Sequence, residues 1–201
     1  MAHYYSKQQE IAHDRKQLQF TLRHFQLRFM SDSGVFSKNG IDYGSRVLID
    51  AMVIPEKAAV LDVGCGYGPI GLTAAKLAVE GHVTMVDVNE RALALADENA
   101  RMNNITNVTI KESDGLAALG DERYDVILTN PPIRAGKEVV HRIFEESYSH
   151  LKPGGSLWIV IQKKQGAPSA LAKLEMLFGE DTVEEVTKDK GYRIYKAVKA
   201  N

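Results

Sequence analysis

The chain has 201 residues, of which 44% are hydrophobic and 25% are charged, and this composition is typical of one globular domain. Its net charge of −1 argues against a protein that coats nucleic acid indiscriminately, and the lack of a long apolar run predicts a cytoplasmic protein with no membrane partner. Its single cysteine, Cys65, and six histidines without ligand spacing argue against a disulfide framework and a metal site.

The first part of the chain is rich in aromatic residues and mixed in its period. Two short segments alternate apolar and polar residues, as half-buried strands do, and a later segment has the apolar spacing of a helix. The predicted elements are strands at 18–22 and 25–29, a loop at 31–34 and a helix at 41–52. Asp42 is the expected N-cap of that helix, and Pro55 follows its end. We expect residues 1–55 to form a short extension that precedes a domain at 56–201.

From residue 58 onward, strand patterns alternate with helix patterns, and this alternation predicts an α/β fold with a parallel, covered sheet. The predicted strands are 58–63, 82–88, 108–111, 124–129, 156–161, 182–187 and 192–198, and the predicted helices are 73–78, 90–102, 139–150 and 170–178. Only residues 188–191 separate the last two strands, so they form a hairpin and the final strand must be antiparallel. The expected fold is therefore a mostly parallel seven-stranded sheet with an antiparallel last strand.

A glycine-rich loop joins the first of these strands to the next helix and reads D-V-G-C-G-Y-G from Asp62 to Gly68. Glycine allows a tight turn and lets a ligand approach the backbone, and the following helix N-terminus offers free N–H groups. The overlapping G-x-G-x-x-G pattern is only a weak signal for a dinucleotide. Because Asp62 would repel a pyrophosphate, a nicotinamide oxidoreductase is the less favoured interpretation.

Acidic residues follow three consecutive strands, and such strand ends are where open α/β sheets bind ligands. Asp62 and the loop carbonyls suit the cationic groups of S-adenosylmethionine, Asp87 suits its ribose hydroxyls, and Asp114 suits its adenine amine. The sequence therefore predicts S-adenosylmethionine as the cofactor. The predicted cofactor-binding residues are Asp62, Gly64, Gly66, Gly68, Asp87, Asp114, Gly115 and Asn130.

The fourth strand is followed by Asn130-Pro131-Pro132-Ile133. The two prolines fix the backbone and remove two N–H donors, so we expect the neighbouring carbonyls to lack local N–H partners. The Asn130 side-chain oxygen and the Pro131 carbonyl then present acceptors for both hydrogens of an amino group, which aims its lone pair at a methyl carbon. Asn130, Pro131 and Pro132 are the predicted catalytic residues.

The loop, Asp87, Asp114 and residues 151–155 resemble class I S-adenosylmethionine-dependent methyltransferases, which have a Rossmann-like fold. The Asn-Pro-Pro tetrad resembles the N-P-P-[FY] motif of amino-group methyltransferases, which act on adenine N6, guanine N2, cytosine N4 or a glutamine amide. Ile133 replaces the aromatic residue that would stack on a planar target. Phe36 and Tyr67 are candidates to supply that stacking instead.

Residues 34–45 and 130–137 resemble the RsmC-like family of bacterial guanine-N2 methyltransferases of small-subunit ribosomal RNA. This resemblance implies guanine N2 of 16S rRNA as the target, and the small subunit or its rRNA as the partner, with the base unpaired or flipped. It also places the extension on the substrate side. The expected substrate-binding residues are Phe36, Lys38, Ile133, Arg134 and Lys137.

Other functions fit the same pattern of residues. A glutamine-amide N-methyltransferase acting on a protein would use the same Asn-Pro-Pro chemistry, and so would an adenine-N6 methyltransferase. A binding module that keeps the fold without turnover is a third possibility, although the intact Asn130 tetrad and the three acids argue against it.

Overall fold

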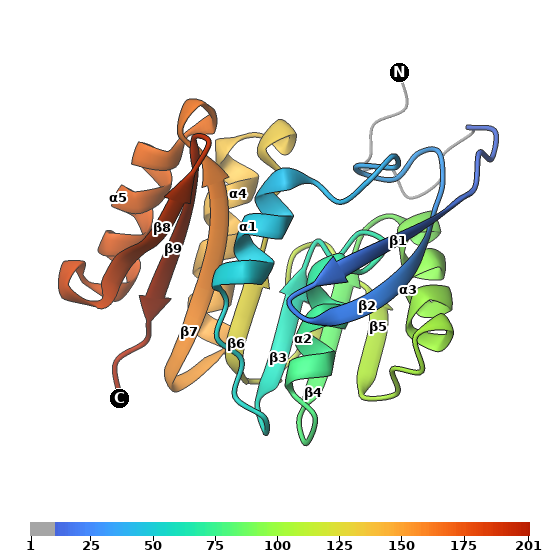
Figure 1. Cartoon of the computed structure of the whole chain (residues 1–201). Coiled ribbons are helices and arrows are strands. Elements are labelled where there is room, and N and C mark those ends of the chain that lie inside the picture. Colours follow the sequence, from blue (N-terminus) through green and yellow to red (C-terminus); the bar gives the residue numbers. More distant parts are fainter. Residues whose placement is uncertain (1–10) are drawn as a thin grey trace.

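The computed structural model describes residues 11–201 and contains a seven-stranded sheet with helices on both faces, together with a two-stranded hairpin (Figure 1). The sheet order is β5-β4-β3-β6-β7-β9-β8. Its strands are β3 (Ala59–Val63), β4 (His82–Asp87), β5 (Val108–Glu112), β6 (Tyr124–Thr129), β7 (Leu151–Gln162), β8 (Val183–Asp189) and β9 (Tyr192–Val198). The strands from β5 to β7 pair in parallel, and β9 runs antiparallel to both of its neighbours. The predicted α/β fold with an antiparallel last strand is confirmed.

Two hydrophobic cores lie on opposite faces of the sheet, because successive residues of a strand point to opposite sides. In β3, Val60 belongs to one core, whereas Leu61 and Val63 belong to the other. The first core is covered by α1 (Tyr43–Ala51), α2 (Pro69–Leu77) and α3 (Glu90–Met102), and the second by α4 (Lys137–His150) and α5 (Ala167–Phe178). Within residues 11–201, none of the helices is long and apolar enough to cross a bilayer.

The N-terminal extension packs into the first core. Its hairpin pairs β1 (Lys16–Leu22) with β2 (Phe25–Ser31). The buried side chains of Leu27 and Phe29 in β2 belong to the first core, as do the buried side chains of α1. The first ten residues of this extension lie outside the described residues. The boundary expected at residues 55 and 56 stays a prediction, and one continuous core crosses it.

Of the elements that begin earlier than the sequence pattern predicts, α2 and β7 differ most. Helix α2 begins at Pro69, directly after the loop, because Gly68 adopts a left-handed conformation and proline suits the first helical position. Strand β7 begins at Leu151, because bonds from the Gly154 amide to the Lys199 carbonyl (2.8 Å) and back from Lys199 to Gly155 (2.9 Å) extend its pairing. In both cases the cause is a contact or cap that apolar periodicity does not report.

Short 3₁₀ turns complete the connections between these elements. They are η1 (Ala117–Leu119), η2 (Ile133–Ala135), η3 (Lys163–Gln165) and η4 (Glu180–Thr182). Two of them, η2 and η3, follow the carboxyl ends of the neighbouring strands β6 and β7. They therefore lie at the edge of the sheet where the glycine-rich loop also emerges.

Candidate active site

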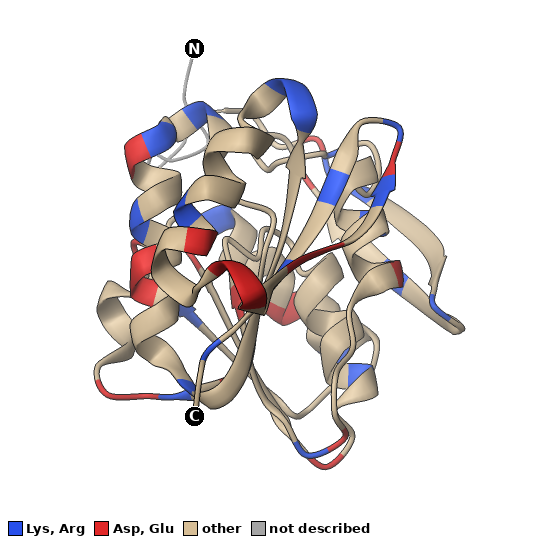
Figure 2. Ribbon diagram, turned by 90° about the vertical axis from the view of Figure 1, so that its left-hand side faces the viewer, with Lys and Arg blue, Asp and Glu red and all other residues tan. Residues whose placement is uncertain are grey.

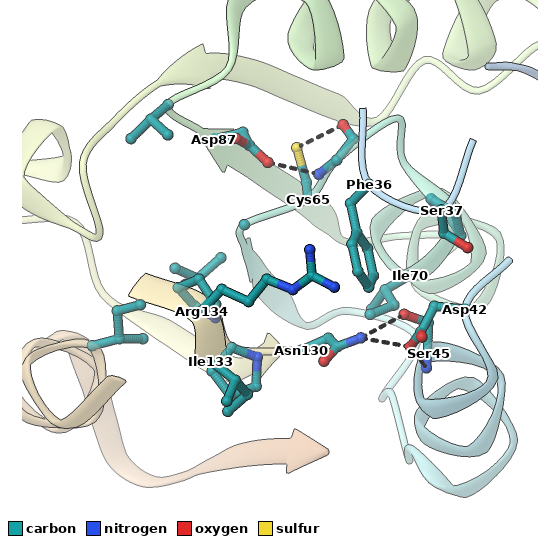
Figure 3. Close-up of a pocket in the computed structure, with 18 of the residues that line it drawn as sticks. Phe36, Ser37, Asp42, Ser45, Cys65, Ile70, Asp87, Asn130, Ile133 and Arg134 are labelled. Carbon is teal, nitrogen blue, oxygen red and sulfur yellow. Dashed lines mark hydrogen bonds between the residues drawn. The ribbon is translucent and has the colours of Figure 1, made fainter. Parts of the chain in front are cut away.

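A cavity of about 380 Å³ opens at the carboxyl ends of β3, β4, β5 and β6 (Figure 3). It brings together most of the residues singled out from the sequence: Phe36, Gly64, Gly66, Asp87, Asp114, Gly115, Asn130, Pro131, Pro132, Ile133 and Arg134. Four other predicted residues, Lys38, Asp62, Gly68 and Lys137, do not line it. The cavity lies where open α/β sheets bind ligands.

The glycine-rich loop folds back over the end of β4. The amides of Gly64 and Cys65 donate to the Val86 carbonyl, at 2.8 and 2.9 Å. Gly64 and Gly66 have positive φ angles of 72° and 56°, which an L side chain adopts only with strain. A Cβ on Gly64 would meet nothing within 4 Å. The loop therefore presents bare backbone toward open space, as an extended ligand requires.

Asp87 is nearly fully buried at the end of β4 and is held by two backbone donors. The Gly66 amide donates to Oδ2 (2.8 Å), and the Asn89 amide donates to Oδ1 (2.9 Å). A carboxylate has about four acceptor sites, so it can accept more bonds than these two. The carboxylate is therefore oriented in advance and can accept from two vicinal hydroxyls, which suits a ribose.

The other two acids lie in different surroundings. Asp62 is fully buried beneath the loop, where a Cβ on Gly71 would come within 2.8 Å of its Oδ2. Burial raises the pKa of Asp62 to about 7, and the Gly71 backbone N–H offsets only part of this effect. Asp114 is exposed and accepts from the Arg142 guanidinium at 2.7 Å. Of the three, Asp87 is the acid that is both buried and on the cavity wall.

Asn130 is oriented by the N-terminus of α1. Its Nδ2 donates to Asp42 Oδ2 (2.9 Å) and to Ser45 Oγ (3.0 Å), as Figure 3 shows. The same Asp42 oxygen accepts the Ser45 amide (3.0 Å) and caps the helix. With the amide nitrogen fixed in this way, the Asn130 oxygen is the acceptor that the side chain can offer to a ligand.

The sequence reasoning assigned Asp42 only a capping role and missed Ser45. The capping signal was correct, but nothing in the local pattern shows that this cap also holds Asn130, which is 88 positions away. The contact arises because α1 packs against β7, β9 and α2, which brings its N-terminus to Asn130, directly after β6. The extension is therefore part of the site, since it fixes the tetrad.

One expectation about the tetrad is wrong. The Pro131 carbonyl accepts from the Ile133 amide (2.9 Å), and the Pro132 carbonyl accepts from the Ala135 amide (2.9 Å). The reason is that Pro132, at φ −76° and ψ 78°, folds the chain into a tight turn that returns N–H groups to these carbonyls. The Pro131 oxygen keeps one lone pair for a ligand, so Asn130 is the principal acceptor.

The aromatic residues near the site differ in their exposure. Phe36 lines the cavity and is 52% exposed, whereas Tyr67 is 2% exposed and donates its hydroxyl to the Gly40 carbonyl (2.9 Å). Tyr192, at the start of β9, also lines the cavity, and the sequence reasoning missed it because only the sheet order brings it there. Phe36 is therefore better placed than Tyr67 to stack on a planar target.

The three predicted cations lie in different places. Arg134 extends its guanidinium into the cavity, between Asn130 and Asp87 (Figure 3). Lys38 lies 3.5 Å from Asp14 and does not line the cavity. Lys137 lines a neighbouring cavity of about 110 Å³. In the part of the chain from residue 11 onward, no group of three or more potential metal ligands occurs.

The sheet order, the glycine-rich loop and the buried Asp87 at the end of β4 define a class I S-adenosylmethionine-dependent methyltransferase. The chain belongs to the methyltransferase small domain family, whose model matches residues 26–196. The resemblance drawn from the sequence is confirmed at this level, and so is S-adenosylmethionine as the cofactor.

Several relatives are similar over most of this chain. It is 55% identical over 199 residues to the uncharacterized protein YbxB of Bacillus subtilis, with 98% of each chain covered. It is 33% identical to ribosomal RNA small subunit methyltransferase C of Vibrio cholerae, over 87% of this chain and 50% of that one. It is 28% identical to ribosomal RNA large subunit methyltransferase G of Shewanella loihica, over 92% of this chain and 48% of that one.

Among solved structures, the fold is similar to that of a T. thermophilus 16S rRNA N2 G1207 methyltransferase in complex with AdoMet and guanosine. The TM-score is 0.81 at 24% identity, and the match covers 92% of this chain and 50% of that one. The chain thus spans about half the length of the ribosomal RNA methyltransferases that it matches.

Proposed function

We propose that the protein transfers the methyl group of S-adenosylmethionine to an exocyclic amine of ribosomal RNA, and specifically to guanine N2 of 16S rRNA. The observation that carries this proposal is the orientation of Asn130, whose amide nitrogen is held by Asp42 and Ser45 so that its oxygen is left to accept. Two of the relatives are named as ribosomal RNA methyltransferases, one of the small and one of the large subunit, and these names support rRNA as the substrate class.

In this proposal, the cofactor lies along the glycine-rich loop, where Gly64 and Gly66 offer backbone and Asp87 accepts from the ribose. Asp114 and Gly115 lie at the adenine end of the cavity. Asp114 is paired with Arg142, so a hydrogen bond to adenine would have to share that carboxylate. The bound cofactor supplies an electrophilic methyl group on a sulfonium.

The target amine is then positioned by acceptors. Asn130 Oδ1 and the second lone pair of the Pro131 carbonyl accept its two hydrogens, which turns the nitrogen lone pair away from them and toward the methyl carbon. The new N–C bond forms as the S–C bond breaks. The nitrogen becomes acidic as it is methylated and releases its proton to water, so this step requires no strong base. Phe36 stacks on the base, because Ile133 stands where the motif otherwise has an aromatic residue.

The test is incubation of the protein with radiolabelled cofactor and, separately, unmodified small subunits, large subunits and total cell protein. Digestion to nucleosides or amino acids, followed by mass spectrometry, then identifies the product. Label in N2-methylguanosine from small subunits supports the proposal. Label in N6-methyladenosine or in N-methylglutamine overturns the proposed target, and Asn130→Ala serves as the inactive control in each reaction.

A further inference from the structure

Most lysine and arginine side chains between residues 11 and 201 have a partner. Some pair with a carboxylate, as Lys57 does with Glu80, and others bond to carbonyls or lie over an aromatic ring. The exceptions in this part of the chain have no carboxylate, hydrogen-bond or ring partner. They are Arg134, Lys137, Lys163, Lys164 and Lys188, which we call the cationic rim.

These unpartnered cations come from three separate segments, yet they lie at one edge of the sheet. Arg134 and Lys137 follow β6, and Lys163 and Lys164 form η3 after β7. Lys188 precedes the β8–β9 turn, which the bond from the Lys163 amide to the Gly191 carbonyl (2.8 Å) ties to η3. Figure 2 shows lysine and arginine prevailing at the upper end of this side of the molecule.

The rim is continuous with the catalytic cavity. The smaller cavity of about 110 Å³ is lined by Lys137, His141 and Ser169, and it shares Ile133 and Gln165 with the larger one. Gln165 directly follows Lys164 in η3. An RNA strand that leaves the Asn130 site across Ile133 would therefore pass Lys137 first and the η3 lysines next.

At the opposite edge, where the strands begin, two lysines are paired with carboxylates. Lys57 precedes β3 and lies 3.5 Å from Glu80, and Lys152, near the start of β7, lies 3.0 Å from Asp125. On the rim side, Asp189 accepts a hydrogen bond from the Tyr43 hydroxyl, and no ion pair among residues 11–201 involves a rim cation. Neighbouring cations without counter-charges repel one another, so such a cluster suits a polyanion that neutralises it.

We infer that the cationic rim holds the phosphates of the RNA strand on one side of the target nucleotide, with the smaller cavity taking the phosphate nearest to it. This inference rests on the proposed function and names how its substrate is held. Phosphate contacts position a strand without reading its sequence. The rim therefore contributes affinity and register, while the selection of the amine remains with Asn130 and Phe36.

The test compares two double variants, Lys163→Gln with Lys164→Gln, and Lys57→Gln with Lys152→Gln as the matched control. Each removes two positive charges at one edge of the sheet. Binding of a fluorescein-labelled single-stranded RNA of about 20 nucleotides is measured by anisotropy between about 50 and 200 mM KCl. Cofactor titration by calorimetry confirms that both variants are folded and bind the cofactor as the wild type does.

For the rim variant we expect about tenfold weaker RNA binding at 0.1 M salt, and a log–log salt slope shallower by about 1.4, since each phosphate contact in a single strand contributes about 0.7. The loss should be the same for unrelated RNA sequences. The control variant should bind as the wild type does. Equal losses in both variants, no loss in the rim variant, or no RNA binding by the wild type each overturn the inference.

The binding experiment, read together with the methylation assay described above, separates this inference from the proposed function. If the rim variant loses RNA affinity as expected but the wild type methylates no RNA, the proposed target fails and the rim stands. If the wild type methylates small subunits and the rim variant binds and methylates equally well, the proposed function stands and the rim fails.

Discussion

The two halves of the site differ in charge and in the way that they present polar groups. The half at β3, β4 and β5 offers glycine backbone and the carboxylates of Asp87 and Asp114. The half at β6 and β7 offers the Asn130 amide, two prolines and the cations Arg134 and Lys137. Acceptors suit a ligand that carries hydroxyls and positive charge, whereas cations suit a phosphate chain. In the proposed function, the cofactor would therefore bind on the first side and the substrate on the second, with Asn130 between them.

The largest effect should come from the residue where the two halves meet. Asn130→Ala removes the acceptor for the target amine, so we expect the methyl transfer rate to fall ~10²-fold or more, since positioning is lost. Cofactor affinity should stay near the wild-type value. Single-turnover methylation alongside calorimetric cofactor titration checks both. A parallel loss of rate and cofactor affinity would instead assign Asn130 to the cofactor half.

The structure also sharpens what a carboxylate would do at this position. From the motif alone, Asn130→Asp should be partly tolerated, because an aspartate still accepts the same hydrogen bonds. In the structure its second oxygen would face Asp42 Oδ2, which now accepts from Asn130 Nδ2 at 2.9 Å. We therefore expect Asn130→Asp to be nearly as slow as Asn130→Ala. Combining it with Asp42→Asn, which supplies a donor, should restore part of the rate.

The cofactor half depends most on Asp87. Asp87→Ala should weaken cofactor binding by about 1.5–3 kcal/mol, the range for hydrogen bonds to a charged group, and should leave RNA affinity unchanged. Asp114→Ala is the matched comparison, and its effect should be smaller, because this carboxylate is exposed and already paired with Arg142. Calorimetry with S-adenosylmethionine measures both. Unchanged affinity in a folded Asp87→Ala protein would remove Asp87 from the cofactor site.

Asp42 should have a smaller effect, because it acts through Asn130. We expect Asp42→Ala to lower kcat about tenfold with little change in KM, and to cost about 1 kcal/mol of stability through loss of the helix cap. Asp42→Asn keeps an acceptor for both bonds and should remain close to wild type. In the Asn130→Ala background, Asp42→Ala should not slow the reaction further. An additive loss there would mean that Asp42 does not work through the amide.

The fold could be predicted because its signals are local. Apolar runs and glycine breaks predict where the strands and helices lie along the chain, and the short connection before β9 predicts that the last strand is antiparallel. The site was predicted only where the chemistry lies in one short motif, as with Asn130 and the loop. The contact of Asp42 with Asn130, the position of Tyr192 and the pairing of Asp114 with Arg142 each join distant segments. No periodicity reports such contacts, because they depend on how the helices pack against the sheet.

The smallest effect on function should come from Asp62, which the loop motif suggested as a cofactor ligand but which lies buried beneath the loop. Asp62→Asn should change cofactor affinity by no more than about twofold, which corresponds to the ~0.3–0.5 kcal/mol within which distant groups act independently. Its effect should appear in stability instead. The pKa of Asp62 is about 7 in the folded protein, and near 3.9 in an unfolded chain. Between about pH 4 and 7 the folded state therefore binds the extra proton.

Because of this difference, the unfolding free energy of the wild type should fall relative to Asp62→Asn as the pH rises from about 5 to 7, by roughly 1 kcal/mol per pH unit, and should level off above about 7. Urea unfolding of both proteins at several pH values measures it. Parallel stability curves would show that Asp62 is ionised at all of these pH values. A large loss of cofactor affinity in Asp62→Asn would return this carboxylate to the acidic half of the site, as its position in the motif first suggested.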